Sequence, residues 1–180
     1  MSETDSYIYI KEKSLSIDQC NLVIDYINQS RTQFAGHYFV VYDNIDNTPF
    51  EFIPNTVLDH LKKYQEEHKF LKTLYAPWGL DRGWNLQKYL PGQAYHPEHM
   101  EHGYESYDCR RLVAWMIYLN DVQDGGETYW PQQDFKKSAR AGDLCIWPAG
   151  WTHTHYGIVS KTELKYVVTG WCSFSVTDGL

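Results

Sequence analysis

The second half of the chain alternates short β-type segments with turn residues, and this pattern constrains the fold more than any other feature. The segments are rich in aromatic and β-branched residues, and Pro91-Gly92 and Asp124-Gly125-Gly126 supply turns between them. Several short strands at such spacing are typical of a β-sandwich or a β-barrel. The expected strands cover residues 84–90, 112–120, 127–130, 143–147 and 165–174.

The first 80 residues predict a strand and two helices. The strand is expected at residues 7–10. Ser16 and Gln19 form a capping box, after which apolar residues recur at helical spacing. A second helix is expected from Asn55, again with one apolar face. We interpret these helices as a support packed on a sheet, and we find no residue among them that indicates chemistry.

The length of 180 residues predicts a single domain, residues 1–180, large enough for a hydrophobic core. Within it we expect an N-terminal support over 1–80 and a β core over 83–176. Aromatic residues make up 16% of the chain, with 15 Tyr and 7 Trp. This content favours an aromatic-rich β core, a cavity lined by rings, or both.

The charge and the cysteines restrict the partners and the compartment. The net charge of −7 disfavours a nucleic-acid partner, because phosphate backbones need concentrated Lys and Arg, and Arg110-Arg111 is too small a patch. The four Cys are scattered without a CxxC pair, which is typical of a reduced compartment. No stretch resembles a signal peptide or approaches the roughly 20 apolar residues of a membrane span. We therefore expect a cytoplasmic protein without membrane contact, and the oligomeric state is not predicted.

Two imidazoles and one carboxylate form the most informative candidate site. His99 and Glu101 lie near the middle of the chain, and His155 follows more than fifty residues later. Such a donor set suits a non-haem Fe(II) that keeps open positions for oxygen chemistry. The His-x-Glu tripeptide is weak evidence alone, because 8 His and 23 acidic residues give about one by chance. A second such tripeptide begins at His96, and His153 lies close to the distal ligand, so both stay alternatives at this point.

Strand alternation adds independent support for a site. Residues two apart on a strand face the same side, so His99 and Glu101 can converge on one ion. Polar and bulky side chains share one face of each of two expected strands, which suits a cavity: Asn85, Gln87 and Tyr89 on one, and Lys165, Val167, Thr169, Trp171 and Ser173 on the other. Lys165 is then either a solvent-facing strand lysine or a cation that holds the far end of an acidic cosubstrate.

A set of motifs between Leu86 and Phe174 carries a family resemblance. They are Gln87-Lys88-Tyr89-Leu90-Pro91-Gly92-Gln93, His99-Met100-Glu101, Tyr118-Leu119-Asn120-Asp121, Gly125-Gly126-Glu127-Thr128, His155-Tyr156-Gly157, Lys165, Thr169 and Trp171. In order and spacing they resemble the catalytic core of the 2-oxoglutarate- and Fe(II)-dependent dioxygenases, specifically the prolyl-hydroxylase-like branch with its small phage and bacterial relatives. The resemblance covers about half of the chain. It implies a mainly β fold, a double-stranded β-helix (jelly-roll, cupin-like) core buttressed by the N-terminal helices.

The resemblance also implies a role for each matching residue. His99, Glu101 and His155 would bind Fe(II), with His96 and His153 as second choices, because the family places a tyrosine ten residues before the first ligand and a basic residue nine or ten after the last. Lys165 would pair with the distal carboxylate of 2-oxoglutarate, and hydroxyl groups would assist it. Those hydroxyls belong to Tyr89, Tyr118 and Thr169, with Gln87 as a further second choice, while Trp171 would pack beside the site.

The implied reaction is the hydroxylation of a C–H bond with Fe(II), 2-oxoglutarate and O₂, supported by ascorbate, and with release of succinate and CO₂. The implied substrate is a prolyl residue of a peptide or protein. A free amino acid or small metabolite is the alternative substrate. A non-catalytic metal- or ligand-binding β-barrel is the alternative of another class.

One ligand departs from the family pattern, and one loop needs an interpretation. Most members carry Asp where this chain has Glu101, whose extra methylene requires the carboxylate to fold back towards the metal. A carboxylate at this position favours hydroxylation over halogenation, in which a halide takes its place. The segment 102–108 follows this ligand, and we expect it either to close over the site as a lid or to be a plain surface loop.

Overall fold

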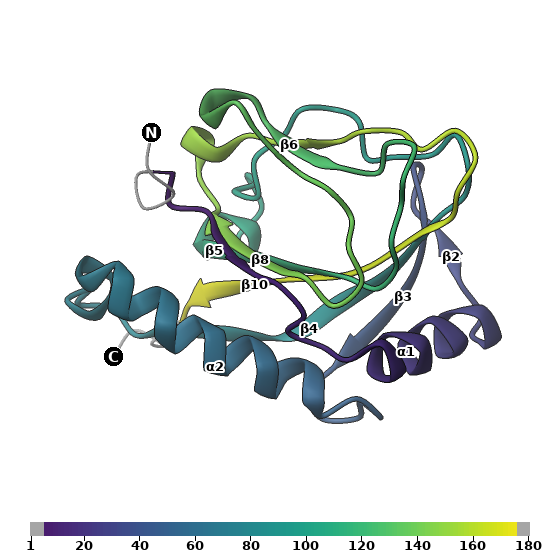
Figure 1. Ribbon diagram of the computed structural model, residues 1–180. Helices are drawn as coiled ribbons and strands as arrows, with labels where there is room; N and C mark the ends of the chain where they lie inside the picture. The colour runs from purple at the N-terminus through teal and green to yellow at the C-terminus, as the bar shows by residue number, and fades with distance from the viewer. Residues whose placement is uncertain (1–5, 176–180) are drawn as a thin grey trace.

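The computed structural model describes residues 6–175 and contains two antiparallel β-sheets and two long helices (Figure 1). The elements in chain order are β1 (Tyr9–Lys11), α1 (Ile17–Gln29), β2 (Gln33–Phe34), β3 (Phe39–Asn44), α2 (Phe52–Glu67), η2 (Lys69–Lys72), β4 (Trp78–Tyr89), η3 (Asp108–Arg110), β5 (Arg111–Tyr118), β6 (Thr128–Trp130), η4 (Pro131–Gln133), β7 (Phe135–Lys137), β8 (Leu144–Pro148), η5 (Trp151–His153), β9 (Tyr156–Gly157) and β10 (Lys165–Phe174).

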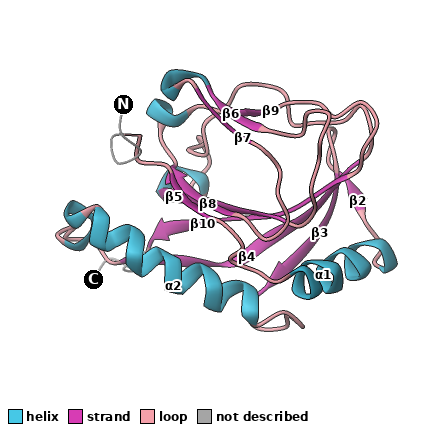
Figure 2. Ribbon diagram, viewed as in Figure 1, coloured by secondary structure: helices cyan, strands magenta, loops and turns pink. Residues whose placement is uncertain are grey.

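The two sheets differ in size and lie one above the other. The larger has seven strands in the order β1-β8-β5-β10-β4-β3-β2, and the smaller has three in the order β7-β6-β9. In Figure 2 the smaller sheet lies above the larger one, and the two long helices α1 and α2 lie below it, on the opposite face. The early strands β1 to β3 occupy the two ends of the larger sheet. The N-terminal part is therefore woven into the sheet that carries the later strands.

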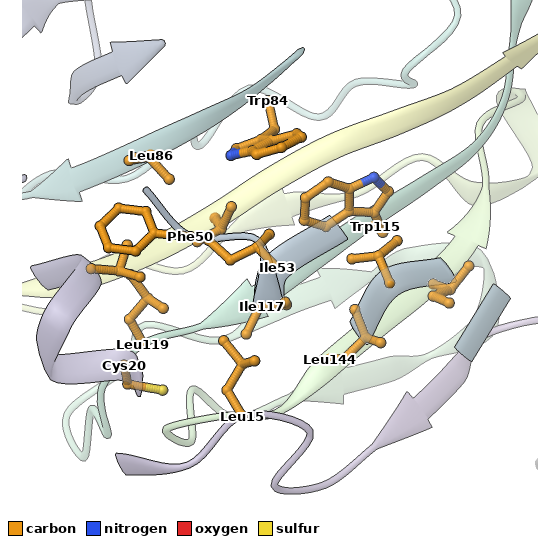
Figure 3. Close-up of a cluster of buried hydrophobic side chains, with 14 of the residues drawn as sticks. Leu15, Cys20, Phe50, Ile53, Trp84, Leu86, Trp115, Ile117, Leu119 and Leu144 are labelled. Carbon is orange, nitrogen blue, oxygen red and sulfur yellow. The ribbon is translucent and has the colours of Figure 1, made fainter. Parts of the chain in front are cut away.

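The helices cover one face of the larger sheet with an apolar core. Helix α1 begins at the predicted capping box of Ser16, and buries Cys20, Val23 and Ile27 at helical spacing. These side chains pack with those of α2 and with Trp84 and Trp115 of the sheet, as Figure 3 shows in part. No helix in the described range 6–175 is both long enough and apolar enough to cross a membrane.

A second cluster fills the space between the two sheets. It contains Tyr118, Trp130, Trp147 and Val167, all almost fully buried. Tyr166 and Val168 belong instead to the cluster on the helix side, so β10 alternates between the two clusters as predicted. The aromatic content therefore serves a buried core on both faces of the larger sheet.

Several predicted boundaries are wrong, each for a local reason. Strand β1 begins at Tyr9 rather than at residue 7, because Tyr7 has a φ of 55° and cannot continue an extended strand. Helix α2 begins at Phe52 rather than Asn55, because Pro54 lies in the first helical turn, where its missing N–H is not needed. The remaining strand boundaries shift by a few residues, with β4 starting six residues earlier. The strands β2, β3, β7 and β9 were not predicted at all.

Candidate active site

Backbone pairing brings the two predicted histidine ligands together. The N–H of His99 donates to the carbonyl of His155 at 3.1 Å, and the N–H of His155 donates back to the carbonyl of His99 at 2.9 Å. The N–H of Glu101 donates to the carbonyl of Ala149 at 3.0 Å, a separate contact with the residues that precede η5. Two segments far apart in sequence thus form a short antiparallel bridge. The side chains of His99 and His155 project from this bridge side by side, and their ring centroids lie 4.4 Å apart.

Backbone acceptors fix the orientation of both rings. Nδ1 of His99 lies 2.9 Å from the carbonyl oxygen of Pro97, and Nδ1 of His155 lies 3.0 Å from that of His153. Because a carbonyl oxygen can only accept, each Nδ1 carries a proton, and deprotonation of each ring would therefore leave its lone pair on Nε2. This is the orientation that metal-binding histidines usually have.

The third ligand completes a donor set that fits a divalent cation. Oε1 of Glu101 lies 3.2 Å from Nε2 of His155 and 3.8 Å from Nε2 of His99. The ligand atoms of the three residues all lie within 4.8 Å of one another. Three lone pairs at this separation repel one another unless a cation or a proton lies among them. Two nitrogens and one carboxylate oxygen suit Fe(II), with room left for further ligands on the cavity side.

The electrostatics of His99 and Glu101 agree with this arrangement. Burial lowers the pKa of His99, and the neighbouring His155 adds to the effect. Burial alone would raise the pKa of Glu101, but hydrogen bonding and charge from His155, the charge of His99 and the indole of Trp171 outweigh it and lower that pKa to about 2. The neutral imidazole and the ionised carboxylate that a metal requires are therefore the forms present at neutral pH.

The outer oxygen of Glu101 is held by two residues of the larger sheet. The indole Nε1 of Trp171 donates to Oε2 at 2.6 Å. One guanidinium nitrogen of Arg111 lies 3.9 Å from the same oxygen and donates to the backbone carbonyl of Glu101 at 3.1 Å. The carboxylate thus points Oε1 towards the two histidines and Oε2 away from them.

These ligands line a cavity between the two sheets. Its volume is about 390 Å³, and it is bordered by all three predicted metal ligands. Lys165 lies in its wall, and none of the ion pairs formed by residues 6–175 includes this lysine. The other predicted residues in the wall are Gln87, Tyr89, Thr169 and Trp171. One cavity therefore holds both a cation site and a buried ammonium group.

Lys165 is surrounded by aromatic rings rather than by carboxylates. Its side chain is buried, and Nζ lies 5.3 Å from the ring centroid of Tyr118 and 5.6 Å from that of Tyr89. Burial lowers the pKa of Lys165 to about 8, although Cys145 and Glu127 oppose the shift. The charged form is thus present at neutral pH but lacks an anionic partner at hydrogen-bonding distance.

The predicted hydroxyl groups are engaged with protein partners. The hydroxyl of Tyr89 donates to Oε1 of Gln87 at 2.8 Å, and that of Thr169 donates to the carbonyl of Trp115 at 3.1 Å. Tyr118 is fully buried behind the cavity wall, and its hydroxyl donates to Oγ1 of Thr128 at 2.7 Å. Tyr118 therefore contributes its ring to the surroundings of Lys165, while Thr128 lines the cavity in front of it.

The two alternative histidines lie outside the cluster. His96 is exposed, and its Nδ1 lies 3.1 Å from the carbonyl oxygen of Ala94. His153 is buried, with Nε2 2.8 Å from the carbonyl oxygen of Ser6 and Nδ1 3.0 Å from Oγ1 of Thr152. Neither ring belongs to the group of converging ligand atoms found among residues 6–175.

Sequence reasoning missed several further cavity residues, among them Tyr38, Tyr95 and Arg111. Tyr38 precedes β3, lines the cavity and packs on Tyr89 with ring centroids 5.2 Å apart, so a residue outside the two predicted N-terminal helices brings the first 80 residues to the site. Tyr95 packs edge-on against His99 at 4.4 Å. Arg111 was dismissed as part of a small basic patch, yet its side chain lies in the cavity wall. The run of aromatic and β-branched residues that opens Phe39–Asn44 is a sequence signal that could have indicated β3, and so Tyr38 beside it.

The segment 102–108 borders the mouth of the cavity. Gly103 and Asp108 line it, whereas the side chain of Tyr104 projects fully into solvent. Oδ1 of Asp108 pairs with Arg111 at 2.8 Å, which ties the end of the segment to the cavity wall. Closure of this segment over a substrate stays a prediction.

The chain matches a known protein family in sequence. Residues 84–173 match the sequence model of the 2OG-Fe(II) oxygenase superfamily. No curated protein sequence matches the chain.

The solved structures similar in fold include three prolyl hydroxylases. The viral collagen prolyl hydroxylase vCPH from Paramecium bursaria Chlorella virus-1, in complex with 2OG, is 17% identical with a TM-score of 0.74, and the match covers 97% of this chain and 100% of that one. A Pseudomonas putida prolyl-4-hydroxylase is 16% identical (TM-score 0.72; coverage 95% and 94%). A Trichoplax adhaerens prolyl hydroxylase in complex with a hypoxia inducible factor peptide fragment is 15% identical (TM-score 0.72; coverage 94% and 84%). The predicted double-stranded β-helix core with N-terminal helices is confirmed.

Proposed function

We propose that this chain, which belongs to the 2OG-Fe(II) oxygenase superfamily, hydroxylates a prolyl residue of a peptide or protein. It is a 2-oxoglutarate-dependent dioxygenase, and Fe(II) and 2-oxoglutarate are its cofactors. The observation that carries the proposal is a single cavity in which three converging ligand atoms share the wall with an unpaired, buried ammonium group.

In this proposal the residues that line the cavity have different roles. His99, Glu101 and His155 hold Fe(II) through Nε2, Oε1 and Nε2, and they leave the cavity side of the ion open. Bound Fe(II) and 2-oxoglutarate together supply the oxidising power drawn from O₂, with release of succinate and CO₂. The chain contributes the orientation of the reactants and the exclusion of water.

Lys165 binds the distal carboxylate of 2-oxoglutarate. A buried ammonium without an anionic partner is unfavourable, so a carboxylate that reaches it gains a strong charge-assisted hydrogen bond. The hydroxyl of Tyr89 lies in the same wall, and its hydrogen can rotate from Gln87 to a carboxylate oxygen. Burial raises the pKa of Tyr89 well above its usual range, so this hydroxyl stays a donor at neutral pH.

The prolyl substrate is supported by the fold that the chain shares with three prolyl hydroxylases, one of which was solved with a peptide fragment. A free amino acid or small metabolite is the alternative within the same chemistry.

The first experiment tests the reaction class. Purified protein supplied with Fe(II), ascorbate and 2-oxoglutarate is expected to form succinate without added substrate. His155→Ala should abolish it, because one of three metal ligands is lost. His96→Ala is the matched control, since its ring lies near the site but outside the ligand cluster, and it should retain activity. Absence of succinate from the wild type under all conditions would indicate a non-catalytic binding protein.

The second experiment tests the substrate. Mass spectrometry would follow the gain of one oxygen across proline-containing peptides, matched peptides with alanine in place of proline, and free amino acids. Oxygen gain only in the proline-containing peptides is the expected result. Oxygen gain in a free amino acid with none in any peptide would replace the prolyl proposal by the metabolite one.

A further inference from the structure

We propose that Trp171, held in place by Arg111, is a positioning residue that makes Glu101 a one-oxygen metal ligand. The pair would explain how this chain uses glutamate where its family usually has aspartate. This inference rests on the metal site of the proposed function. It concerns the orientation of one ligand, which the activity alone does not determine.

The extra methylene of Glu101 gives its side chain a rotational freedom that the hydrogen bond from Trp171 restricts. A glutamate side chain has one more rotatable bond than aspartate, and fixing such a bond on binding costs free energy. The indole N–H of Trp171 donates to Oε2 at 2.6 Å, while Oε1 faces both histidines. With Oε2 occupied, the carboxylate cannot turn that oxygen towards the metal. The ligand is therefore held in a one-oxygen geometry before any metal arrives.

Arg111 fixes the indole from its other side. Its guanidinium carbon lies 3.8 Å from the ring centroid of Trp171, a stacking contact. The same guanidinium donates to the backbone carbonyl of Glu101 at 3.1 Å and pairs with Asp108 at 2.8 Å. The guanidinium of Arg111 thus contacts both residues that form the Trp171–Glu101 hydrogen bond. That group is almost buried, with only 16% of its side chain exposed.

The fold places Arg111 here through an irregular strand pairing. Cys172 of β10 pairs with Val113, and the next residue, Ser173, pairs with Arg111, so Leu112 is an extra residue on β5. Leu112 and Val113 both pack on the helix side of the sheet. The extra residue therefore turns Arg111 to the cavity side, where Trp171 lies.

The hydrogen bond of Trp171 is not a default feature of buried indoles in this protein. Four other tryptophans have a buried Nε1 for which no hydrogen-bond partner exists among residues 6–175: Trp84, Trp115, Trp130 and Trp147. These four indoles therefore contribute by packing. Trp171 combines its packing with a carboxylate partner that is also a metal ligand.

Trp171→Phe tests the role, because it keeps a ring for Arg111 and removes only the N–H and part of the bulk. With Co(II) as the probe, titrated by calorimetry, affinity is expected to fall roughly tenfold, the scale of losing a hydrogen bond to a metal ligand. The visible absorption of bound Co(II) is expected to change as Oε2 becomes free to approach the ion. Trp115→Phe is the matched control, since it removes an unpartnered indole N–H on the helix side of the same sheet. It should lose stability but keep Co(II) affinity and spectrum.

A double-mutant cycle separates positioning from general packing. In Glu101→Asp the shorter side chain cannot both reach the metal and accept from the indole. Trp171→Phe is therefore expected to lower Co(II) affinity less than about twofold in the Glu101→Asp background, against roughly tenfold in the wild type. Equal losses in both backgrounds, or a Trp171→Phe protein that binds Co(II) with wild-type affinity and spectrum, would overturn the inference while leaving the proposed oxygenase intact. A wild-type protein that binds no Co(II) would remove the metal site and the inference together.

Discussion

Replacing Lys165 by methionine is expected to stabilise the cofactor-free protein while abolishing its use of 2-oxoglutarate. Methionine has a similar length and fills the same space without a charge. The buried ammonium of Lys165 contacts the rings of Tyr89 and Tyr118 and takes part in none of the ion pairs described for the chain. Its charge is therefore a cost to folding that Glu127 offsets only in part and that a bound anion would offset further.

The size of this cost follows from the pKa of Lys165. Burial lowers it from 10.5 to about 8, which corresponds to roughly 3 kcal/mol against the charged form. Below pH 8 both the folded and the unfolded chain carry the proton, so the folded protein bears the full cost. Between pH 8 and 10.5 the unfolded chain binds more protons than the folded one, so the free energy of unfolding rises with pH. Lys165→Met should thus gain up to roughly 3 kcal/mol at pH 7 and little at pH 10.5.

Urea unfolding of the metal-free protein, followed by tryptophan fluorescence at pH 7 and pH 10, measures both effects. Lys137→Met is the matched control, because Lys137 is also near the ring of Tyr118 but pairs with buried Asp143 at 2.5 Å. Its removal leaves that carboxylate unpaired and should destabilise the protein by roughly 3 kcal/mol. A Lys165→Met protein less stable than the wild type at pH 7 would refute the reasoning, and so would a wild-type stability that does not rise above pH 8.

Three further outcomes are expected. The KM for 2-oxoglutarate should rise about tenfold per pH unit above pH 8, because the free enzyme loses the charge of Lys165; a flat KM between pH 7 and 9.5 would argue against its role. Gly125→Ala should lower the melting temperature, with a loss of at least about 1 kcal/mol, because Gly125 has a φ of 109° and an added Cβ would lie 2.3 Å from the carbonyl oxygen of Val159. Gly79→Ala, where nothing lies within 4 Å of an added Cβ, should change it little by comparison. Limited proteolysis at Tyr104 should slow when metal, 2-oxoglutarate and peptide are all present, and unchanged cleavage would identify the segment 102–108 as a plain surface loop.

Elements that depend on neighbouring residues could be predicted from the sequence. Ser16 caps α1 through a bond to Gln19 three residues away, and the strand Lys165–Phe174 follows from its own alternation. Strand β3 could not be predicted in the same way, because its place depends on pairing with β4 about forty residues later. Tyr38 precedes that strand and lines the cavity, and it was therefore not predicted as a site residue.

Side chains facing the cavity could be predicted only where strands are regular. Lys165, Thr169 and Trp171 alternate as expected and all line the cavity. Arg111 does not follow the alternation of β5, because the extra residue Leu112 reverses its side. Tyr118 does follow it and faces the space between the sheets, yet its hydroxyl turns to Thr128 rather than to the cavity.

The sequence by itself determined which chemistry is available, since two imidazoles, a carboxylate and a lysine at family spacing have their properties in any fold. Only the tertiary structure decided which of eight histidines converge, because that choice depends on a backbone bridge between His99 and His155. It also decided that Glu101 accepts hydrogen bonds from Trp171 and Arg111, which the pairing irregularity of β5 places together. The physical reason is one of range: caps and alternation are local, whereas strand register and bulges are set by partners far away in the chain.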